Sequence, residues 1–97
     1  MVYAIAQLKI TDRAAYNHYQ QRFMSVMKQF KGRVLAADEH PQIVEGQWDR
    51  EKVVLLEFPD ETAFREWAES PEYVEIARDR KAGSDAVVLL VQGIGNR

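Results

Sequence analysis

The chain has 97 residues, of which 46% are hydrophobic and 29% are charged, a composition typical of one globular domain and unlike that of a disordered segment. Its formal net charge of −2 lacks the basic excess that phosphate binding requires, so we expect no nucleic-acid partner. The absence of cysteine excludes disulfides, thiol nucleophiles and thiolate metal sites.

The first predicted elements are a strand at residues 2–10 and a long helix. The strand carries apolar residues on both of its alternating sets, which predicts cover on both faces. It is too short to cross a bilayer and has no basic leader, so we expect a cytoplasmic protein without membrane contact. After Thr11 and Asp12, which are N-cap residue types, apolar residues recur every three or four positions up to Phe30. This spacing predicts an amphipathic helix of about five turns, which Gly32 ends in a left-handed conformation.

Two further strands are predicted in the middle of the chain. Residues 33–39 alternate as a strand does, and His40-Pro41 interrupts them. Residues 41–48 are expected to form a short ribbon or an extension of that strand, before a polar turn at 49–51. Residues 52–58 are the longest apolar β-type run of the chain and end at Pro59, which predicts a central strand.

The last third of the chain predicts helices and a final strand. Asp60 and Ser70 are placed to cap two consecutive helical stretches, with Pro71 at the first position of the second. Gly83 ends that stretch, and residues 86–91 form a strand that is apolar on both faces. The order strand, helix, strand, strand, helix, strand predicts an α+β, ferredoxin-like βαββαβ fold in a single domain, residues 1–97. Its four-stranded antiparallel sheet would carry the helices on one face.

The predicted topology leaves the other face of the sheet without helices, because right-handed crossovers place both helical segments on the same side. Three of the four strands nevertheless carry apolar residues on both faces. Uncovered, they would expose on the order of several hundred Å² of contiguous apolar surface, more than monomers usually do. A second copy of the chain is the simplest cover, so we predict a homodimer whose sheets pack face to face.

Several motifs also resemble those of a known family: Gly32-Arg33, Val44-Glu45-Gly46, the run 53–59 ending in Glu-Phe-Pro, Ala63 with Trp67, Ser70-Pro71-Glu72-Tyr73 and Arg78. Over nearly the whole chain they resemble the uncharacterised family called domain of unknown function 1330. That family belongs to the dimeric α/β-barrel superfamily, so the resemblance implies the same two-sheet dimer. The stretch 35–38 departs from the family, where a bulkier or basic ending is more common, so a pocket built there would differ from those of relatives.

Three polar residues at strand ends are the candidate catalytic groups. Glu57 follows four aliphatic residues, and burial there would raise its pKa and make it a general base. The structural alternative is an ion pair with Arg33 or Arg78, or a solvated strand end. Asp38 and His40 would form an oriented carboxylate–imidazole pair, and the alternative is a surface strand end before a proline turn.

Aromatic residues at helical spacing are either core or the lining of an apolar pocket. As a pocket, Trp67, Tyr73 and Tyr19 would bind a small ligand, with Arg33 as a charged contact. Trp48 lies in the polar ribbon and is expected to contact an interface or cover a cavity.

The motifs leave two classes of function open. The glycines form no phosphate-binding loop and the two histidines are far apart, so we expect no cofactor and no metal. The first class is an enzyme that applies acid–base chemistry to a small apolar or aromatic metabolite, in the manner of the superfamily's cofactor-free oxygenases and isomerases. The second is a dimer that binds a small ligand, or serves as an interaction module, without catalysis.

Overall fold

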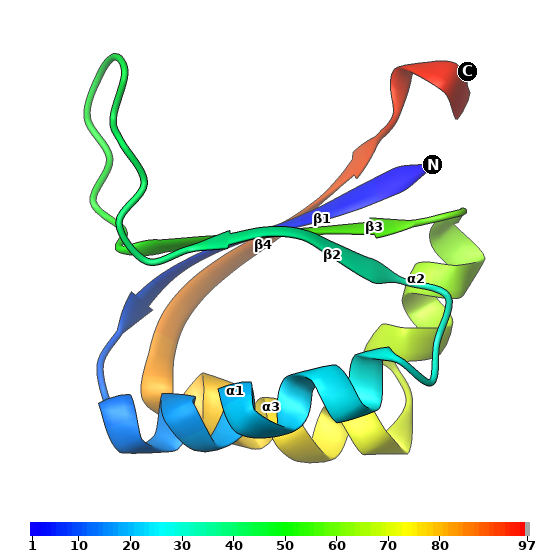
Figure 1. Cartoon of the computed structure of the whole chain (residues 1–97), viewed down its shortest axis with the longest axis horizontal. Helices are drawn as coiled ribbons and strands as arrows, with labels where there is room; N and C mark the ends of the chain where they lie inside the picture. Colours follow the sequence, from blue (N-terminus) through cyan, green and yellow to red (C-terminus); the bar gives the residue numbers. More distant parts are fainter. Residues whose placement is uncertain (97) are drawn as a thin grey trace.

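The computed structural model describes residues 1–96 and consists of one sheet with helices on one side (Figure 1). The strands are β1 (Val2–Ile10), β2 (Arg33–Asp38), β3 (Lys52–Phe58) and β4 (Ser84–Gln92). The helices are α1 (Arg13–Met27), α2 (Glu61–Ala68) and α3 (Pro71–Gly83), and a 3-10 turn, η1, follows at Ile94–Asn96. All neighbouring strands are antiparallel in the order β2-β3-β1-β4. The predicted ferredoxin-like fold is therefore confirmed.

The three helices begin where the sequence predicts. The side chains of Asp12, Asp60 and Ser70 each accept a hydrogen bond from the backbone N–H three residues further on. Each such cap satisfies a donor that the helix leaves unpaired and is worth about 0.5–2 kcal/mol. Pro71 occupies the first turn of α3, where its missing N–H removes no helical bond.

The end of α1 differs from the prediction. The helix stops at Met27 and does not continue to Phe30. Gly32 is not left-handed either, because among residues 1–96 the one glycine with a positive φ is Gly46, at 86°. Gly32 lies instead against the ring of Phe58, where an added Cβ would come within 2.3 Å of a ring carbon. Position 32, just before β2, thus requires glycine because a larger residue would clash with Phe58, and not because of its backbone conformation.

The segment between β2 and β3 is an arm, residues 39–51, and the predicted ribbon at 41–48 is wrong. The arm has no strand pairing, and Figure 1 shows it rising from the sheet on the side away from the helices. Trp48 fixes it, since its Nε1 donates a hydrogen bond to Oε1 of Gln7 in β1 (2.9 Å). Further out, Ile43 and Val44 are 52% and 92% exposed. The arm is therefore held at its base and carries apolar side chains in the open.

The hydrophobic core fills the layer between the sheet and the helices. Alternate residues of β1 and β3 point into this layer and meet side chains from all three helices. Its largest fully buried side chains are those of Tyr16, Phe58, Leu8, Met27, Ile76 and Val2. The core is rich in packed rings, which fixes the spacing between α1, α2 and the sheet.

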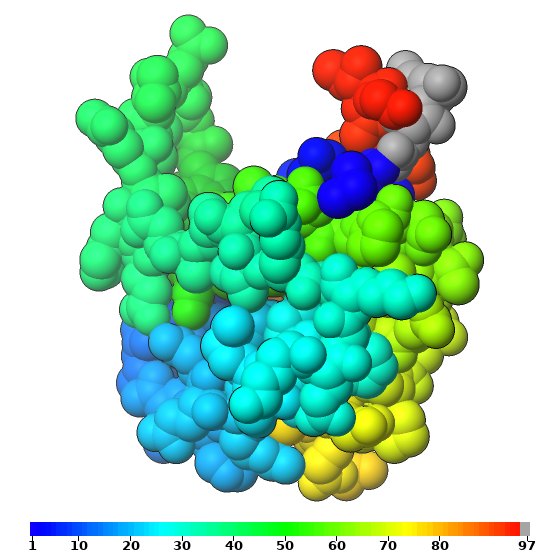
Figure 2. Space-filling view, turned by 45° about the vertical axis from the view of Figure 1, so that its right-hand side comes forward, coloured from blue at the N-terminus to red at the C-terminus, as the bar shows by residue number. Residues whose placement is uncertain are grey.

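The opposite face of the sheet, here called the open face, has no helix over it. Strand register places Leu89 and Val91 of β4 beside Ile5 and Tyr3 of β1 on this face. Leu89 and Val91 are 46% and 40% exposed, and Leu55 of β3 extends the patch. In Figure 2 the arm and the segment after β4 stand up on opposite sides of a hollow. The apolar residues on both faces of the strands thus leave an uncovered apolar surface, as the sequence predicts.

Candidate functional site

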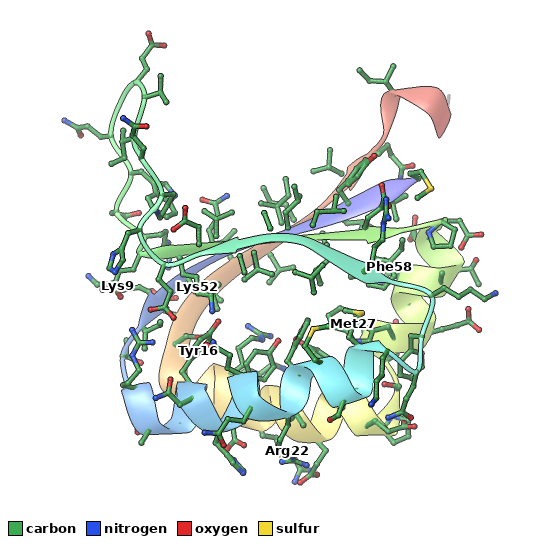
Figure 3. The ribbon with its side chains drawn as sticks, in the orientation of Figure 1. Lys9, Tyr16, Arg22, Met27, Lys52 and Phe58 are labelled. Atoms are coloured by element: carbon green, nitrogen blue, oxygen red, sulfur yellow. The ribbon has the colours of Figure 1, made fainter. Side chains whose placement is uncertain are left out.

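A buried lysine lies at the start of β3 on the helix side of the sheet. Lys52 pairs with Leu8 across β1 and β3 and shares its buried face. Only 6% of the Lys52 side chain is exposed. Figure 3 shows Lys52 and Tyr16 in the layer between the sheet and α1. Because lysine is almost never fully buried unless its charge is paired, the contacts of its amine decide what it does.

Three side chains surround the Nζ atom of Lys52. Nζ donates a hydrogen bond to Oε1 of Gln20 (3.2 Å) and lies 4.8 Å from the centroid of the Tyr16 ring. The nearest carboxylate oxygen, Oε2 of Glu39, is 3.8 Å away. Burial lowers the pKa of Lys52; the charge of Glu39 opposes this, and that of Arg13 adds to it. A lowered pKa increases the fraction of neutral amine, the form that accepts a proton or attacks carbon.

An apolar cavity of about 170 Å³ opens beside this amine, between α1 and the β2–β3 edge of the sheet. Among the described residues that line it, Lys52 is the charged one; the lining is Tyr16, Tyr19, Gln20, Phe23, Met24, Val34, Ala37, Lys52 and Val54. An apolar cavity of about 150 Å³ is known to hold benzene. This cavity therefore has room for a small aromatic molecule with one reactive group at Lys52. We call it the Lys52 cavity.

Glu39, the first residue of the arm, links Lys52 to the surface. Arg13 binds both oxygens of its carboxylate, at 3.2 Å (Nη1 to Oε2) and 3.1 Å (Nη2 to Oε1). The hydrogen bond from Arg13 lowers the pKa of Glu39, so the group stays a carboxylate at neutral pH. About a third of its side chain, 33%, is exposed. Glu39 thus lies between the buried amine and solvent.

A second and more open cavity, of about 330 Å³, lies at the base of the arm. It is lined by Ile10, Arg13, Glu39, His40, Pro41, Ile43, Trp48, Arg50 and Glu51. Glu39 therefore borders this cavity while its carboxylate also reaches Lys52. Of the predicted catalytic residues, His40 is the one that lines it.

The predicted ligand-binding residues Tyr19, Tyr73 and Trp67 are brought together inside the core. The hydroxyl groups of Tyr19 and Tyr73 lie 3.0 Å apart, and the rings of Trp67 and Tyr73 are 4.0 Å apart between centroids. Burial raises the pKa of Tyr19, and it raises that of Tyr16 to about 12, so both hydroxyls stay protonated at neutral pH. Of the three predicted residues, Tyr19 lines the Lys52 cavity, whereas Tyr73 and Trp67 pack behind it.

Glu57 lies on the open face, away from the Lys52 cavity. It pairs with Tyr3 in the strand register, and its Oε1 accepts a hydrogen bond from Nε of Arg33 at 2.7 Å. Only 10% of the Glu57 side chain is exposed, against 71% of that of Arg33. The ion pair that the sequence leaves as the structural alternative is therefore observed. It also places Arg33, the predicted charged ligand contact, on the opposite side of the sheet from Tyr19.

Asp38 and His40 are close together but not as an oriented pair. Oδ1 of Asp38 accepts a hydrogen bond from the backbone N–H of His40 (2.8 Å), which turns the chain at the end of β2. Asp38 pairs with Val53, four residues along β3 from Glu57, or about 13 Å at the usual strand rise. The three predicted acid–base residues are thus spread over the strand end, the second cavity and the open face.

Lys52 and Glu39 are not among the site residues predicted from the sequence. Lys52 is the polar first residue of an apolar run, yet it shares an alternating set with Val54, Leu56 and Phe58, the set that faces the helices. That alternation is the signal that could have placed the lysine inside. Nothing in the local sequence joins it to Gln20 or Glu39, which come from distant segments.

Residues 1–96 contain neither a metal-binding cluster nor a membrane-spanning helix. Within this range no group of three or more histidine, aspartate or glutamate side chains is placed to hold a metal ion. None of the helices of this part of the chain is long and apolar enough to cross a membrane.

The model of the family described as Domain of unknown function (DUF1330) matches residues 1–94, and no curated protein matches the sequence. RPA0582, a protein of unknown function from Rhodopseudomonas palustris, is 18% identical with a TM-score of 0.80, over 96% of this chain and 82% of its own. A dimeric protein of unknown function and ferredoxin-like fold from Bacteroides fragilis is 13% identical with a TM-score of 0.70, over 95% of both chains. SnoaB, a cofactor-independent oxygenase from Streptomyces nogalater, is 15% identical with a TM-score of 0.65, over 95% of this chain and 91% of its own. At these identities the likeness shows a shared ferredoxin-like fold.

Proposed function

The chain belongs to the DUF1330 family of domains of unknown function, and from its geometry we propose a homodimeric enzyme that transfers protons on a small apolar or aromatic molecule without a cofactor. The observation that carries this proposal is the buried amine of Lys52 at the wall of an apolar cavity. A neutral amine is a general base, and the ammonium that it becomes is a general acid. The carboxylate of Glu39 lies 3.8 Å from this amine and is partly exposed, so a charged group stands between Lys52 and solvent.

The size and polarity of the cavity limit the substrate. Its lining is apolar apart from Lys52, Gln20 and the tyrosines, so a charged substrate would lose its hydration without enough polar partners to replace it. A neutral aromatic molecule gains from burial and can place one acidic C–H or O–H group near Nζ. Removal of that proton is the step for which the site is equipped, and both isomerisation and oxygenation of a carbanion start from it.

The solved neighbours support the proposal through fold analogy. SnoaB is described as a cofactor-independent oxygenase, and the Bacteroides fragilis protein as dimeric. One fold supports many activities, so the site of this chain, and not the likeness, names the chemistry. The apolar residues of the open face support the homodimer, with the two sheets packed face to face.

A second candidate is a dimer that binds the same class of molecule without catalysis. It is favoured by the lining of the cavity, in which Lys52 is the one charged side chain among the described residues. Glu57, Asp38 and His40 as acid–base groups stay a separate proposal, since each lies outside the Lys52 cavity.

A base-catalysed elimination tests proton transfer without knowledge of the natural substrate. The probe is 1,2-benzisoxazole, a small neutral aromatic molecule whose ring opens to 2-cyanophenol when a base removes its C3 proton. We expect the wild-type protein to form cyanophenol faster than Lys52→Met, while Lys9→Met, which changes an exposed lysine of β1, behaves as wild type. Equal rates in wild type and Lys52→Met would reject proton transfer by Lys52. Binding of the probe without turnover would then favour the non-catalytic dimer.

A further inference from the structure

We propose that Lys52 is a covalent site, at which the amine condenses with the carbonyl group of a small aromatic aldehyde or ketone in the Lys52 cavity to give an imine. The inference rests on the proposed function, since it uses the same amine and the same cavity. It deepens that function by naming carbonyl compounds as the substrate class.

The backbone fixes where the amine stands. Lys52 is the first residue of β3 and pairs with Leu8 of the central strand β1. The backbone N–H of Glu51 also donates to the carbonyl oxygen of Leu8 at 2.8 Å, so the chain is tied to β1 directly before the lysine. With the stem of the side chain buried and Nζ bound to Gln20, the amine is presented to the cavity and not to bulk water. A nucleophile held in this way needs little reordering before it attacks.

The charges around the amine leave it able to lose its proton. Glu39 is the carboxylate that contacts it, and 3.8 Å is too long for a hydrogen bond. Arg13 already binds both oxygens of that carboxylate, so Glu39 stabilises the ammonium less than an unshared partner would. The face of the Tyr16 ring at 4.8 Å favours the ammonium, but such contacts are weak beside the cost of burying a charge. The buried setting is therefore that of a lysine suited to nucleophilic attack.

The reaction is balanced without an oxidant or a reductant. The neutral amine adds to the carbonyl carbon, and one of its two protons passes to the carbonyl oxygen, which becomes a hydroxyl group. This hydroxyl group then takes the second proton of the nitrogen and leaves as water, while the nitrogen lone pair forms the C=N bond. One amine and one carbonyl compound thus give one imine and one water. The apolar lining of the cavity favours the loss of this water.

Imine formation would also give a second route to an acidic substrate proton, in which Lys52 withdraws electrons and is not the base. A protonated imine withdraws electrons from the neighbouring carbon, so a C–H bond beside it becomes acidic. The same cavity would then bind a carbonyl compound, activate it and exchange its proton. In that step the nitrogen of Lys52 is part of the C=N bond, so the proton passes to a group other than Lys52.

Trapping with benzaldehyde tests the covalent step. The full chain is incubated at neutral pH with limiting benzaldehyde and sodium cyanoborohydride, which reduces the imine to a stable benzyl amine. The labelled lysines are then found by digestion and mass spectrometry at successive times. We expect Lys52 to be labelled before the exposed lysines Lys9, Lys28, Lys31 and Lys81, which are internal controls. Benzyl alcohol has the same ring without a carbonyl group and should slow the labelling of Lys52 alone.

Two variants distinguish the contribution of the amine to labelling from that of the cavity. Lys52→Arg keeps the charge but cannot form an imine, so its label is lost while the exposed lysines keep theirs. Val34→Phe fills the cavity and leaves Lys52 in place, so the label at Lys52 should fall. Circular dichroism checks that both variants are folded. If Val34→Phe does not fold, protection of wild-type Lys52 by benzyl alcohol tests the role of the cavity instead.

The outcomes distinguish this inference from the function on which it rests. Uniform labelling of exposed lysines, or an unlabelled Lys52 in a protein that binds benzyl alcohol, would overturn the imine. Turnover of 1,2-benzisoxazole that depends on Lys52 would still support proton transfer in that case, because this probe has no carbonyl group. Failure to bind benzyl alcohol, to form the label and to open the benzisoxazole would overturn both.

Discussion

Oε2 of Glu39 lies 3.8 Å from Nζ of Lys52, and this contact joins the buried cavity to the surface of the protein. The same carboxylate is bound on its other side by Arg13, at 3.1 and 3.2 Å. Lys52 therefore shares its counter-ion with a second cation. Burial outweighs the attraction that remains, and the pKa of Lys52 is lowered.

The lowered pKa predicts how stability depends on pH. Below the folded-state pKa of Lys52, the amine is charged in both the folded and the unfolded chain, and folding carries the cost of burying the charge. Between that pKa and the ordinary value of 10.5, the unfolded chain binds more protons than the folded one, so the contribution of Lys52 to stability rises with pH. We expect Lys52→Met to be more stable than wild type at pH 7, on the order of 1 kcal/mol, by a margin that narrows towards pH 10.

Urea unfolding at a series of pH values measures this difference. Lys9→Met is the matched control for the loss of a lysine charge, because Lys9 is an exposed lysine of β1. Other groups titrate in both proteins and cancel in the comparison. A constant margin between Lys52→Met and wild type would contradict a lowered pKa at Lys52.

The buried hydroxyl pair of Tyr19 and Tyr73 predicts a non-additive effect of mutation. Their oxygens are 3.0 Å apart inside the core, so removal of one hydroxyl leaves the other buried without its partner. Tyr73→Phe is expected to lower the free energy of unfolding by about 1–3 kcal/mol. The double change of both tyrosines to Phe should cost less than the sum of the single changes, because no unpaired hydroxyl remains. Additive losses in denaturant unfolding would show that the bond contributes nothing.

The order of helices and strands along the chain, the helix caps and the two-sided apolarity of the strands could be predicted, because each depends on a local sequence pattern. The alternation in residues 2–10 and 52–58 and the caps at Asp60 and Ser70 each act within a few residues. The prediction of a ribbon at 41–48 is wrong because a strand also needs a pairing partner from elsewhere in the fold. Ile43 and Val44 have the composition of a strand, but no neighbouring strand pairs with them in the fold.

The candidate site was harder to predict because its members come together only in three dimensions. Lys52 from β3, Gln20 from α1 and Glu39 from the arm are separated by 13 or more residues in sequence. The sequence analysis favoured Glu57 instead, the carboxylate most isolated among apolar residues. Its partner Arg33 lies 24 residues away along the chain, and the sheet places the pair on the open face.

The position of Glu57 predicts a structural more than a catalytic effect. Glu57→Gln keeps an acceptor for Arg33 but removes the charge, and the exposed Arg33 limits the loss of stability to about 0.5–1 kcal/mol. The pair lies on the open face, so the variant should weaken association of the subunits while benzisoxazole turnover per folded subunit stays as in wild type. Loss of turnover with unchanged association and stability would instead assign acid–base catalysis to Glu57.

The homodimer can be tested with two neighbouring residues of β4 that differ in the face they occupy. Leu89 pairs with Ile5 on the open face, and Val88 pairs with Ala6 on the helix side, yet they are 46% and 48% exposed. Leu89→Glu would place a charge between two packed sheets, where its desolvation has no compensation, and should raise the dissociation constant of the dimer at least about tenfold. Val88→Glu has the same change of charge at the same exposure and should leave the dimer intact. Sedimentation equilibrium measures the mass of each variant and of the wild type. Equal masses for the two variants would contradict packing through the open face. A wild-type protein that is already monomeric at micromolar concentration would contradict it as well.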